Sequence, residues 1–328
     1  MAASSLVRLT PADRERLVAA PAPRAAQAMT AVLAREPFSD PDWIFERKLD
    51  GIRCVAIRDG GPVSLLSRND LSLNRRYPEI ATALEDQPQR RFAIDGEVVA
   101  FAGSQTSFAR LARRGHERVA VFLYVFDVLW LDGQDVRGLE LRARKRLLRN
   151  EMAFDAPALR FSTHRNGDGE AYFAQACRRG WEGLVAKRAD SPYSATRSRD
   201  WLKLKCEQGQ ELVIGGFTAP QGARTDFGAL LLGYHEAGAL RYAGKVGTGF
   251  DRATLRSLGE RLRAIEQPDP SFADAIAVRG AHWVAPELVA VLAFTEWTSA
   301  GRLRHPRFLG LRDDKPAGAV VRERPANG

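Results

Sequence analysis

Apolar residues in the first two thirds of the chain follow two alternating periods. Between Trp43 and Cys206, short runs rich in Val, Ile and Phe have the length of strands, and they alternate with segments whose apolar residues recur at helical spacing. The predicted strands are residues 54–57, 63–66, 92–100, 119–130, 183–187 and 201–205. The predicted helices are residues 78–86, 142–152 and 170–179, and Gly180 is a typical stop for the last of them. The pattern predicts a domain that mixes α and β structure.

The pattern changes after Cys206. Three short apolar segments, ELVIGGF, GALLLGYH and LRYAGKVG, are separated by turns that contain glycine, and a fourth segment, LVAVLAFTEW, follows later. Between them, one face of a single amphipathic helix carries Leu255, Leu258, Leu262 and Ile265. Short strands with one helix suit a small closed barrel of the oligonucleotide-binding (OB) type. We therefore expect an α+β chain of two domains, residues 1–207 and 208–328, joined by a compact hinge.

Composition adds a basic charge and a strong preference for arginine. The formal net charge is +9, and only seven of the 49 basic residues are lysine. A basic chain favours a polyanionic partner such as nucleic acid, although a preference for arginine alone also raises the pI, which is about 9.8 for this sequence. With 45% hydrophobic and 27% charged residues, the chain is not of the disordered class. It is expected to be a globular enzyme or binding protein.

The three cysteines and the apolar segments bear on the compartment. Cys54, Cys177 and Cys206 are odd in number and far apart, which predicts neither a disulfide framework nor a Cys-x-x-Cys zinc site. The N-terminus has no apolar segment of signal-peptide length, and the longest apolar run, residues 119–131, is interrupted by Asp127. We therefore expect a cytoplasmic protein in a reducing compartment, with no membrane partner.

The segment ERKLDGIR, residues 46–53, holds the first candidate for chemistry. Arginine keeps its proton in proteins, whereas a lysine amine can lose its proton and attack an electrophile. A lysine at position 48 in a chain that otherwise prefers arginine therefore suggests that an amine is needed there. The structural alternative is a lysine at a strand end beside an Asp-Gly turn. Lys48 is the candidate nucleophile.

Six further motifs accompany Lys-x-Asp-Gly-x-Arg in a fixed order. They are SRN (67–69), IDGEVV (94–99), YVFDVLWLDG (124–133), EGLVAKR (182–188), DWLKLK (200–205) and LRDDK (311–315). In this order and spacing they resemble the nucleotidyltransferase motifs of the ATP-dependent DNA ligases, most closely the ligase module of bacterial end-joining ligases. The resemblance covers residues 29–321. Five of the seven lysines lie in the motifs, and a sixth, Lys245, lies in AGKVGTGF, which resembles the family's barrel segment.

The resemblance implies a fold and a reaction. The fold is an ATP-grasp-like adenylation (nucleotidyltransferase) domain followed by an OB-fold barrel. In the reaction, Lys48 attacks the α-phosphorus of ATP to form lysyl-AMP, the AMP passes to a 5′-phosphate, and a 3′-hydroxyl then seals the nick. Burial, together with Lys203 and Lys205, is expected to lower the pKa of Lys48 while these cations hold the α-phosphate. Glu97 and Glu182, expected at strand ends, would hold Mg²⁺ or Mn²⁺.

The remaining site residues also follow from the resemblance. Glu46 would meet the base edge and Glu97 the ribose hydroxyl, while Phe126 would stack on adenine, although a pure core role for Phe126 competes with this. Ribose or phosphate contacts are implied for Arg53 and Arg68, and phosphate contacts for Lys187. The resemblance implies that three residues of LRDDK close over ATP and orient the pyrophosphate: Arg312, Asp314 and Lys315. On composition alone, LRDDK could also be an exposed charged loop. RLRHPRF, residues 302–308, is either a solvated basic edge or a strip that contacts phosphates.

Some features depart from the family or leave alternatives open. Ligases that use NAD carry an N-terminal nicotinamide-binding module and zinc cysteines, neither of which is evident here, so ATP is favoured. Family barrels often have an acidic residue where this chain has Val291. We expect a monomeric minimal ligase core, or one cut from a larger protein, that acts on nicked duplex DNA, with end-joining repair proteins as further partners. An RNA ligase, a capping guanylyltransferase or a non-catalytic binder remain alternatives.

Overall fold

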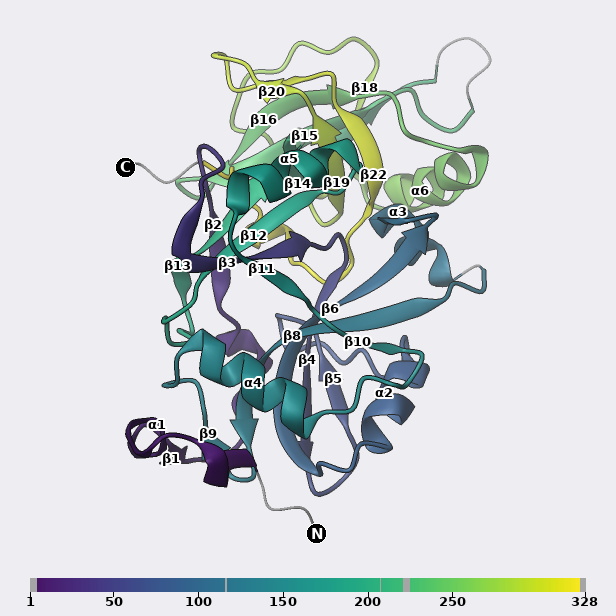
Figure 1. The fold of residues 1–328 in the computed structure, drawn as a ribbon. Coiled ribbons are helices and arrows are strands. Elements are labelled where there is room, and N and C mark those ends of the chain that lie inside the picture. Colours follow the sequence, from purple (N-terminus) through teal and green to yellow (C-terminus); the bar gives the residue numbers. More distant parts are fainter. Residues whose placement is uncertain (1–4, 116, 207, 221–224, 325–328) are drawn as a thin grey trace. The chain divides into compact units, whose positions relative to one another are not determined.

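The computed structural model describes residues 5–115, 117–206, 208–220 and 225–324, and the chain separates into two compact units after Cys206 (Figure 1). None of the helices in these ranges has the length and apolar character needed to cross a membrane.

The first unit contains two sheets. The larger sheet is mainly antiparallel and has the order β1-β9-β8-β6-β4-β5, with β7 paired to β6 and β10 parallel to β8. Its strands are β1 (Val18–Ala19), β4 (Ile52–Asp59), β5 (Ser64–Leu66), β6 (Arg91–Ala102), β7 (Gln105–Thr106), β8 (Val121–Leu131), β9 (Gln134–Asp135) and β10 (Leu159–Phe161). The smaller sheet has the order β11-β3-β12-β13-β2. Its strands are β2 (Thr30–Leu33), β3 (Asp40–Lys48), β11 (His164–Gly167), β12 (Gly183–Arg188) and β13 (Arg197–Lys205).

Helices cover both sheets of the first unit. The α-helices in its described residues are α1 (Pro11–Glu15), α2 (Pro78–Glu85), α3 (Phe108–Ala112), α4 (Leu141–Glu151) and α5 (Gly169–Arg178). α4 packs on β8, and α5 packs on β3 and β12 (Figure 1). α5 ends as predicted, because Gly180 has a φ of +67° and lets the amide of Trp181 turn back to the carbonyl of Ala176 at 3.0 Å.

The predicted elements of the first unit are confirmed with shifts of a few residues at their ends. β3, which carries the candidate nucleophile, was not among them. Its sequence, DPDWIFERK, places three charged residues before or beside the buried Ile44 and Phe45, so no clean alternation marks it as a strand. It pairs with β11 on one side and with β12 on the other, and these tertiary partners stabilise it as a strand.

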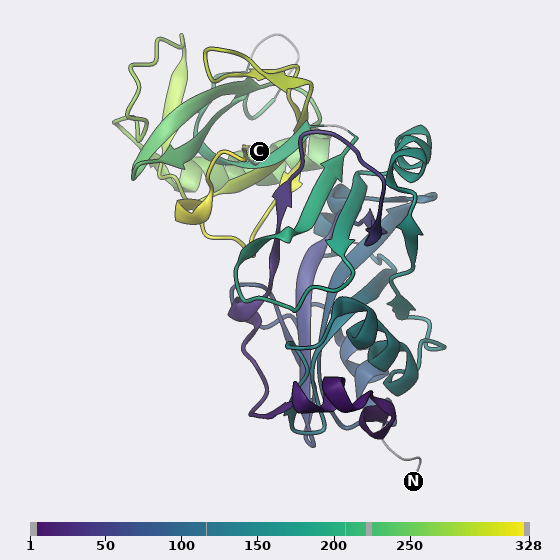
Figure 2. The same ribbon diagram turned by 60° about the vertical axis from the view of Figure 1, so that its left-hand side comes forward.

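The second unit is a curled sheet with one α-helix in its described residues (Figure 2). The order is β16-β15-β14-β18-β17, and β19 joins β14 to β22. The elements are β14 (Gln208–Thr218), β15 (Leu230–Glu236), β16 (Ala239–Val246), α6 (Arg252–Ala264), β17 (Glu266–Gln267), β18 (Ala281–Val284), β19 (Val289–Phe294) and β22 (Arg307–Leu311), with a small hairpin of β20 (Glu296–Trp297) and β21 (Leu303–Arg304). The predicted apolar face of α6 is confirmed, since Leu255, Leu258 and Leu262 pack in the core of the sheet.

One expectation about the cysteines is wrong. Cys177 and Cys206 form a disulfide, and Cys54 is a buried free thiol. Cys177 lies in the last turn of α5 and Cys206 follows β13, so the packing of the helix on the sheet brings two distant residues to a Cα–Cα distance of 5.3 Å. Sequence spacing alone contains no information about this proximity.

Candidate active site

Three neighbouring strands bring motif residues to one face of the smaller sheet. β12 is antiparallel to both β3 and β13, so Gly183 is opposite Lys48 on one side and Lys205 on the other. Two residues further along, Val185 is opposite Glu46 and Lys203. Directly opposed residues, and residues two apart in a strand, point to the same face of a sheet. The register thus places on one face Glu46, Lys48, Lys187, Lys203 and Lys205.

Lys48 ends β3 and is held by a carboxylate. Its Nζ lies 2.5 Å from Oε1 of Glu182, the residue immediately before β12. Burial opposes the positive charge, but the carboxylates of Glu182, Asp50 and Glu97 outweigh burial and raise the pKa of Lys48 above the ordinary lysine value. The expectation of a lowered pKa is therefore wrong for this structure, because the acidic neighbours dominate the field at the amine.

The Asp-Gly pair of the lysine motif holds the turn that follows Lys48 against neighbouring elements. Gly51 lies in the turn between β3 and β4, and a Cβ at this position would collide with the carbonyl oxygen of Val98 in β6. Asp50 Oδ2 accepts the backbone N–H of Phe108 at 2.9 Å, which ties the turn to α3. Glycine permits the close approach of the turn to β6. Lys48 is therefore held beside the larger sheet.

Two carboxylates near Lys48 fit the acidic part of a cation site. Glu182 Oε2 is buried and has no hydrogen-bond partner in the part of the chain that the structure describes. Glu97 acts on Lys48 from β6, but it lies in the middle of that strand, so the expectation that it ends a strand is wrong. Within the described ranges, no group of three or more His, Cys, Asp or Glu side chains could hold a metal ion. Two carboxylates suffice for Mg²⁺ where water and substrate phosphates supply the other ligands.

Glu46 lies at the centre of a buried charged cluster. Its Oε1 accepts a hydrogen bond from Lys145 at 2.5 Å, and its Oε2 accepts bonds from Lys187 at 2.9 Å and from the Ser162 hydroxyl at 3.1 Å. Burial would raise the pKa of Glu46, but the two lysines outweigh burial and lower it. Burial also lowers the pKa of Lys187 to about 8, with Glu46 opposing this change and Lys145 adding to it.

Phe126 is buried in an aromatic and cationic environment. Its ring packs edge-on against Trp201, with 5.9 Å between the ring centroids. Lys187 Nζ lies 4.2 Å, and the Arg53 guanidinium 4.7 Å, from the centroid of Phe126. Arg53 is held there by two hydrogen bonds of 2.5 Å to Asp95 and one of 3.0 Å to the Met29 carbonyl. Phe126 thus belongs to the core and also meets two site residues.

The remaining predicted residues are spread over both units. Arg68 is half-buried in the turn after β5. Arg312, Asp314 and Lys315 follow β22 in the second unit and form one cluster with Glu211 of β14. Arg312 donates to both oxygens of Asp314, at 2.8 and 3.0 Å, and to Glu211 Oε1 at 2.7 Å. Lys315 Nζ lies 2.5 Å from Glu211 Oε2. Despite burial, Arg312 and then Lys315 lower the pKa of Glu211 to about 2.

Comparison with known proteins identifies the family of the chain. The family model described as "ATP dependent DNA ligase domain" matches residues 23–205, and the model described as "ATP dependent DNA ligase C terminal region" matches residues 223–315. This chain belongs to the ATP-dependent DNA ligases. The fold class predicted from the sequence is confirmed: an adenylation domain is followed by an OB-fold domain.

Among known ligases, the chain is similar to parts of larger proteins. It is 38% identical over 295 residues to "Multifunctional non-homologous end joining protein LigD" of Pseudomonas aeruginosa, which covers 87% of this chain and 35% of that protein. It is also 38% identical over 287 residues to the LigD protein of Mycobacterium tuberculosis H37Rv, which covers 86% of this chain and 37% of that protein. The chain thus spans about a third of the length of these relatives. A solved structure, "mycobacterial DNA ligase D complexed with ATP and MES", has a TM-score of 0.66 and 34% identity, with 91% of this chain and 99% of that chain covered.

Two residues that contact the candidate site residues were not found by sequence reasoning. Lys145 lies 3% exposed in α4, and Glu211 lies in the first strand of the OB-fold unit. A signal for Lys145 existed, because it is four residues after Leu141 and three before Leu148, on the apolar face of its helix. No comparable signal marks Glu211, whose partners lie about a hundred residues away.

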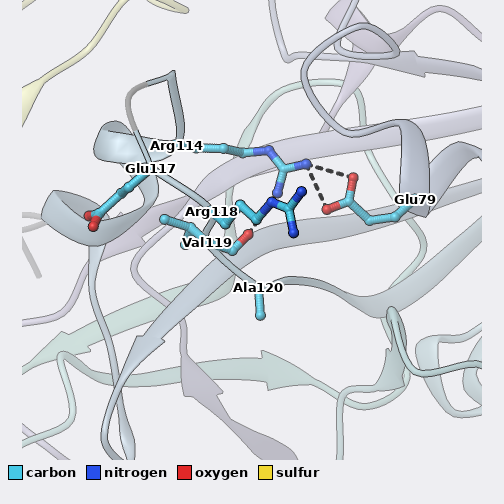
Figure 3. A pocket seen from close by; sticks show the side chains of 6 residues that line it. All are labelled: Glu79, Arg114, Glu117, Arg118, Val119 and Ala120. Carbon is cyan, nitrogen blue, oxygen red and sulfur yellow. Dashed lines mark hydrogen bonds and ion pairs between the residues drawn. The ribbon is translucent and has the colours of Figure 1, made fainter.

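A separate surface pocket of the ligase lies away from these residues (Figure 3). It is lined by Glu79, Arg114, Glu117, Arg118, Val119 and Ala120. The Arg114 guanidinium bonds to Glu79 at 2.7 Å and to the carbonyls of Arg76 and Val119 at 2.7 and 2.8 Å. These bonds hold the loop before β8 in place. None of the predicted nucleotide-binding residues lines the pocket.

Proposed function

We propose that this chain seals 5′-phosphate/3′-hydroxyl nicks in duplex DNA with ATP, by way of lysyl-AMP and DNA-adenylate. The observation that carries the proposal is the environment of Lys48: an amine at a strand end, on one sheet face with three other lysines and beside three carboxylates. Cations on that face suit the negative charge of a phosphoryl group, and Lys48 is the lysine of the Lys-x-Asp-Gly-x-Arg motif, with a carboxylate of Glu182 2.5 Å from its Nζ.

The first step forms a nitrogen–phosphorus bond. Lys48 Nζ, once neutral, attacks the α-phosphorus, the bond to pyrophosphate breaks, and the nitrogen then loses a second proton to water. Because the raised pKa keeps Lys48 as an ammonium, a first proton must leave before the attack. Glu182 Oε1 lies 2.5 Å from Nζ and is the atom placed to receive that proton. Lys203 and Lys205 would hold the α-phosphate and Lys187 the other phosphates, while Phe126 and Glu46 would meet the adenine. Arg53 and Arg68 would contact ribose or phosphate oxygens.

In the later steps, the AMP group is passed on to the DNA. A 5′-phosphate oxygen attacks the phosphorus of lysyl-AMP and releases the amine, and the 3′-hydroxyl then attacks the 5′-phosphorus and releases AMP. Arg312, Asp314 and Lys315 would assist pyrophosphate departure in the first step alone. Glu97 and Glu182 would hold Mg²⁺ or Mn²⁺, which would neutralise phosphate charge. The buried Oε2 of Glu182, which has no hydrogen-bond partner among the described residues, supports this assignment.

The similarity to LigD proteins supports a place in end-joining repair. Nicked duplex DNA is the proposed substrate, the cytoplasm the proposed compartment and other end-joining proteins the proposed partners of a monomeric ligase. These assignments extend what the relatives' names say to a chain that matches about a third of their length.

The test begins with the covalent intermediate. Incubation with ATP and Mg²⁺ should add one AMP to the intact mass, and Lys48→Ala and Lys48→Arg should both abolish this adduct, since arginine supplies no neutral nitrogen. Nicked DNA and nicked RNA, each offered with ATP or GTP, then distinguish a DNA ligase from an RNA ligase or a capping enzyme. An adduct retained in either Lys48 variant would refute the assignment of the nucleophile.

A further inference from the structure

Lys145 lies outside the motifs shared with the ligases, yet it contacts two proposed base-binding elements. Its Nζ donates to Glu46 Oε1 at 2.5 Å, to the Ser162 carbonyl at 3.0 Å and to the Phe126 carbonyl at 3.4 Å. An ammonium group has three N–H donors, and all three are used. Lys145 therefore links the acidic residue of β3 to the strand that carries the aromatic ring.

The contacts of Glu46 leave little acceptor capacity. A carboxylate offers about four lone-pair positions, two on each oxygen. Oε2 accepts from Lys187 and from Ser162, and Oε1 accepts from Lys145. One position on Oε1 is left by the bonds in the described residues, and it can accept a hydrogen bond but cannot donate one.

Titratable side chains approach Glu46 from three directions. Lys145 approaches from α4 and Lys187 from β12, while His164 of β11 is directly opposite Glu46 across the sheet. Burial, followed by Lys145, lowers the pKa of His164, which is therefore neutral near pH 7. Two ammonium groups thus face one buried carboxylate and favour its ionised form.

We propose that Lys145 is a positioning residue that selects a 6-amino purine over a 6-oxo purine, by holding Glu46 as an ionised, acceptor-only carboxylate at the base edge. This inference rests on the proposed function, in which Glu46 meets the adenine. The 6-amino group of adenine donates to such an acceptor, whereas the 6-oxygen of guanine or hypoxanthine is itself an acceptor. Two facing acceptors repel each other and leave buried polar groups unpaired. A site of this kind rejects the wrong base more strongly than a difference in apolar contacts would.

Removal of the Lys145 charge should relax this selection. Glu46 would then be opposed by Lys187 alone, and its carboxyl group would bind a proton or turn more readily. A protonated carboxyl, or a turned one, can meet a 6-oxo purine without repulsion. A purely structural role for Lys145 would lower the yield of active protein and leave the preference between purines unchanged.

The test compares ATP with inosine triphosphate, which carries oxygen in place of the 6-amino group. Both nucleotides are radiolabelled at the α-phosphate, and kcat/KM for adduct formation on Lys48 is measured separately for each. The ratio of the two values is independent of the fraction of folded enzyme. Lys145→Met and Lys145→Gln should each reduce the ATP preference about tenfold or more. Arg146→Met, an exposed substitution in the same helix, is the control and should leave the ratio unchanged.

A double variant shows whether Lys145 acts through Glu46. Glu46→Gln can donate an N–H to a 6-oxygen, so it should relax the preference by itself, and Lys145→Met should change the ratio no further in that background. An unchanged ratio in both Lys145 variants, loss of both adducts, or an additive change in the Glu46→Gln background would overturn the inference. An unmodified chain that forms no AMP adduct would instead refute the proposed function.

Discussion

Glu211 and Val291 are directly opposite each other in the β14–β19 pair of the OB-fold unit. The resemblance to the family led us to expect an acidic residue at position 291, whereas the carboxylate that binds Arg312 and Lys315 comes from Glu211 on the neighbouring strand. Directly opposed residues in an antiparallel pair have Cβ atoms about 5 Å apart and point to the same face of the sheet. A carboxylate at either position could therefore contact the same arginine and lysine side chains.

Glu211→Gln should slow lysine adenylylation about tenfold and leave the sealing of a pre-adenylylated nick nearly unchanged. The reason is that Arg312 and Lys315 would lose the charged group that holds them, and their proposed role is confined to pyrophosphate departure. Single-turnover rates with ATP and with a pre-adenylylated nick measure the two steps separately.

Rescue and control variants sharpen the Glu211 prediction. Adding Val291→Glu to Glu211→Gln should restore most of the adenylylation rate, because it returns a carboxylate to the facing position. Glu236→Gln removes the exposed partner of Arg324, a pair at 2.7 Å, and should change neither step. Equal slowing of both steps by Glu211→Gln would assign Glu211 to folding or DNA binding instead.

Lys187 should give ATP use a pH dependence above neutrality. Its pKa is lowered from 10.5 to about 8, so its amine loses its charge as the pH rises through 8 and its proposed hold on the phosphates weakens. The KM for ATP should rise up to about tenfold between pH 7 and pH 9. Between pH 8 and 10.5, Lys187 binds a proton in the unfolded chain but not in the folded protein, so its contribution makes the free energy of unfolding rise with pH. A loss of folded protein would therefore not explain the expected rise in KM.

A matched pair of lysine variants tests the Lys187 prediction. Lys187→Arg keeps its charge and should give a flat KM over the same range. Lys245→Arg, at an exposed position in β16, should retain the rise of the unmodified protein. A KM that rises equally in Lys187→Arg would place the titrating group elsewhere.

Binding to nicked duplex should be mainly electrostatic and nearly independent of sequence. A ligase must accept a nick anywhere, so it is expected to read phosphates and backbone shape. If roughly six phosphates are neutralised, the slope of log K against log salt should be about −5, whereas adduct formation with ATP should change much less. A flat salt titration, or affinities that differ tenfold between unrelated flanking sequences, would contradict this account.

Two arginines of the basic strip test the salt prediction residue by residue. Arg307 is exposed in β22, whereas Arg304 is paired with Glu296 at 2.7 Å. Arg307→Ala should reduce the magnitude of the salt slope by about 1. Arg304→Ala should reduce it less, because Glu296 already offsets part of its charge.

The Cys177–Cys206 disulfide should stabilise the adenylation unit. It closes a loop with a sequence separation of 29, for which chain entropy predicts about 3 to 4 kcal/mol. Cys177→Ala should therefore lower the free energy of unfolding by an amount of this order and remove its sensitivity to reductant. Cys54→Ala should leave that sensitivity intact. Alkylation of the denatured, unreduced protein should modify one thiol, and modification of all three would show that the bond does not form.

The sequence by itself determined many of the longer strands and helices, the change in apolar pattern after Cys206 and the family. Strand and helix periods are local properties, so the apolar runs of β6, β8 and β12 and the faces of α2 and α6 are readable without tertiary information. The motifs are likewise local, and Lys48 is recognisable because it stands in a short fixed pattern within an arginine-rich chain.

Tertiary structure alone decided which charged groups face one another. The raised pKa of Lys48 depends on Glu97 and Glu182, and the setting of Glu46 depends on Lys145. These partners are brought together by strand register and by helix packing on a sheet, and each lies tens of residues away in sequence. Because the electrostatic effect of a charge depends on distance and burial, neither of which the sequence states, the sign of such a pKa shift follows only from the fold.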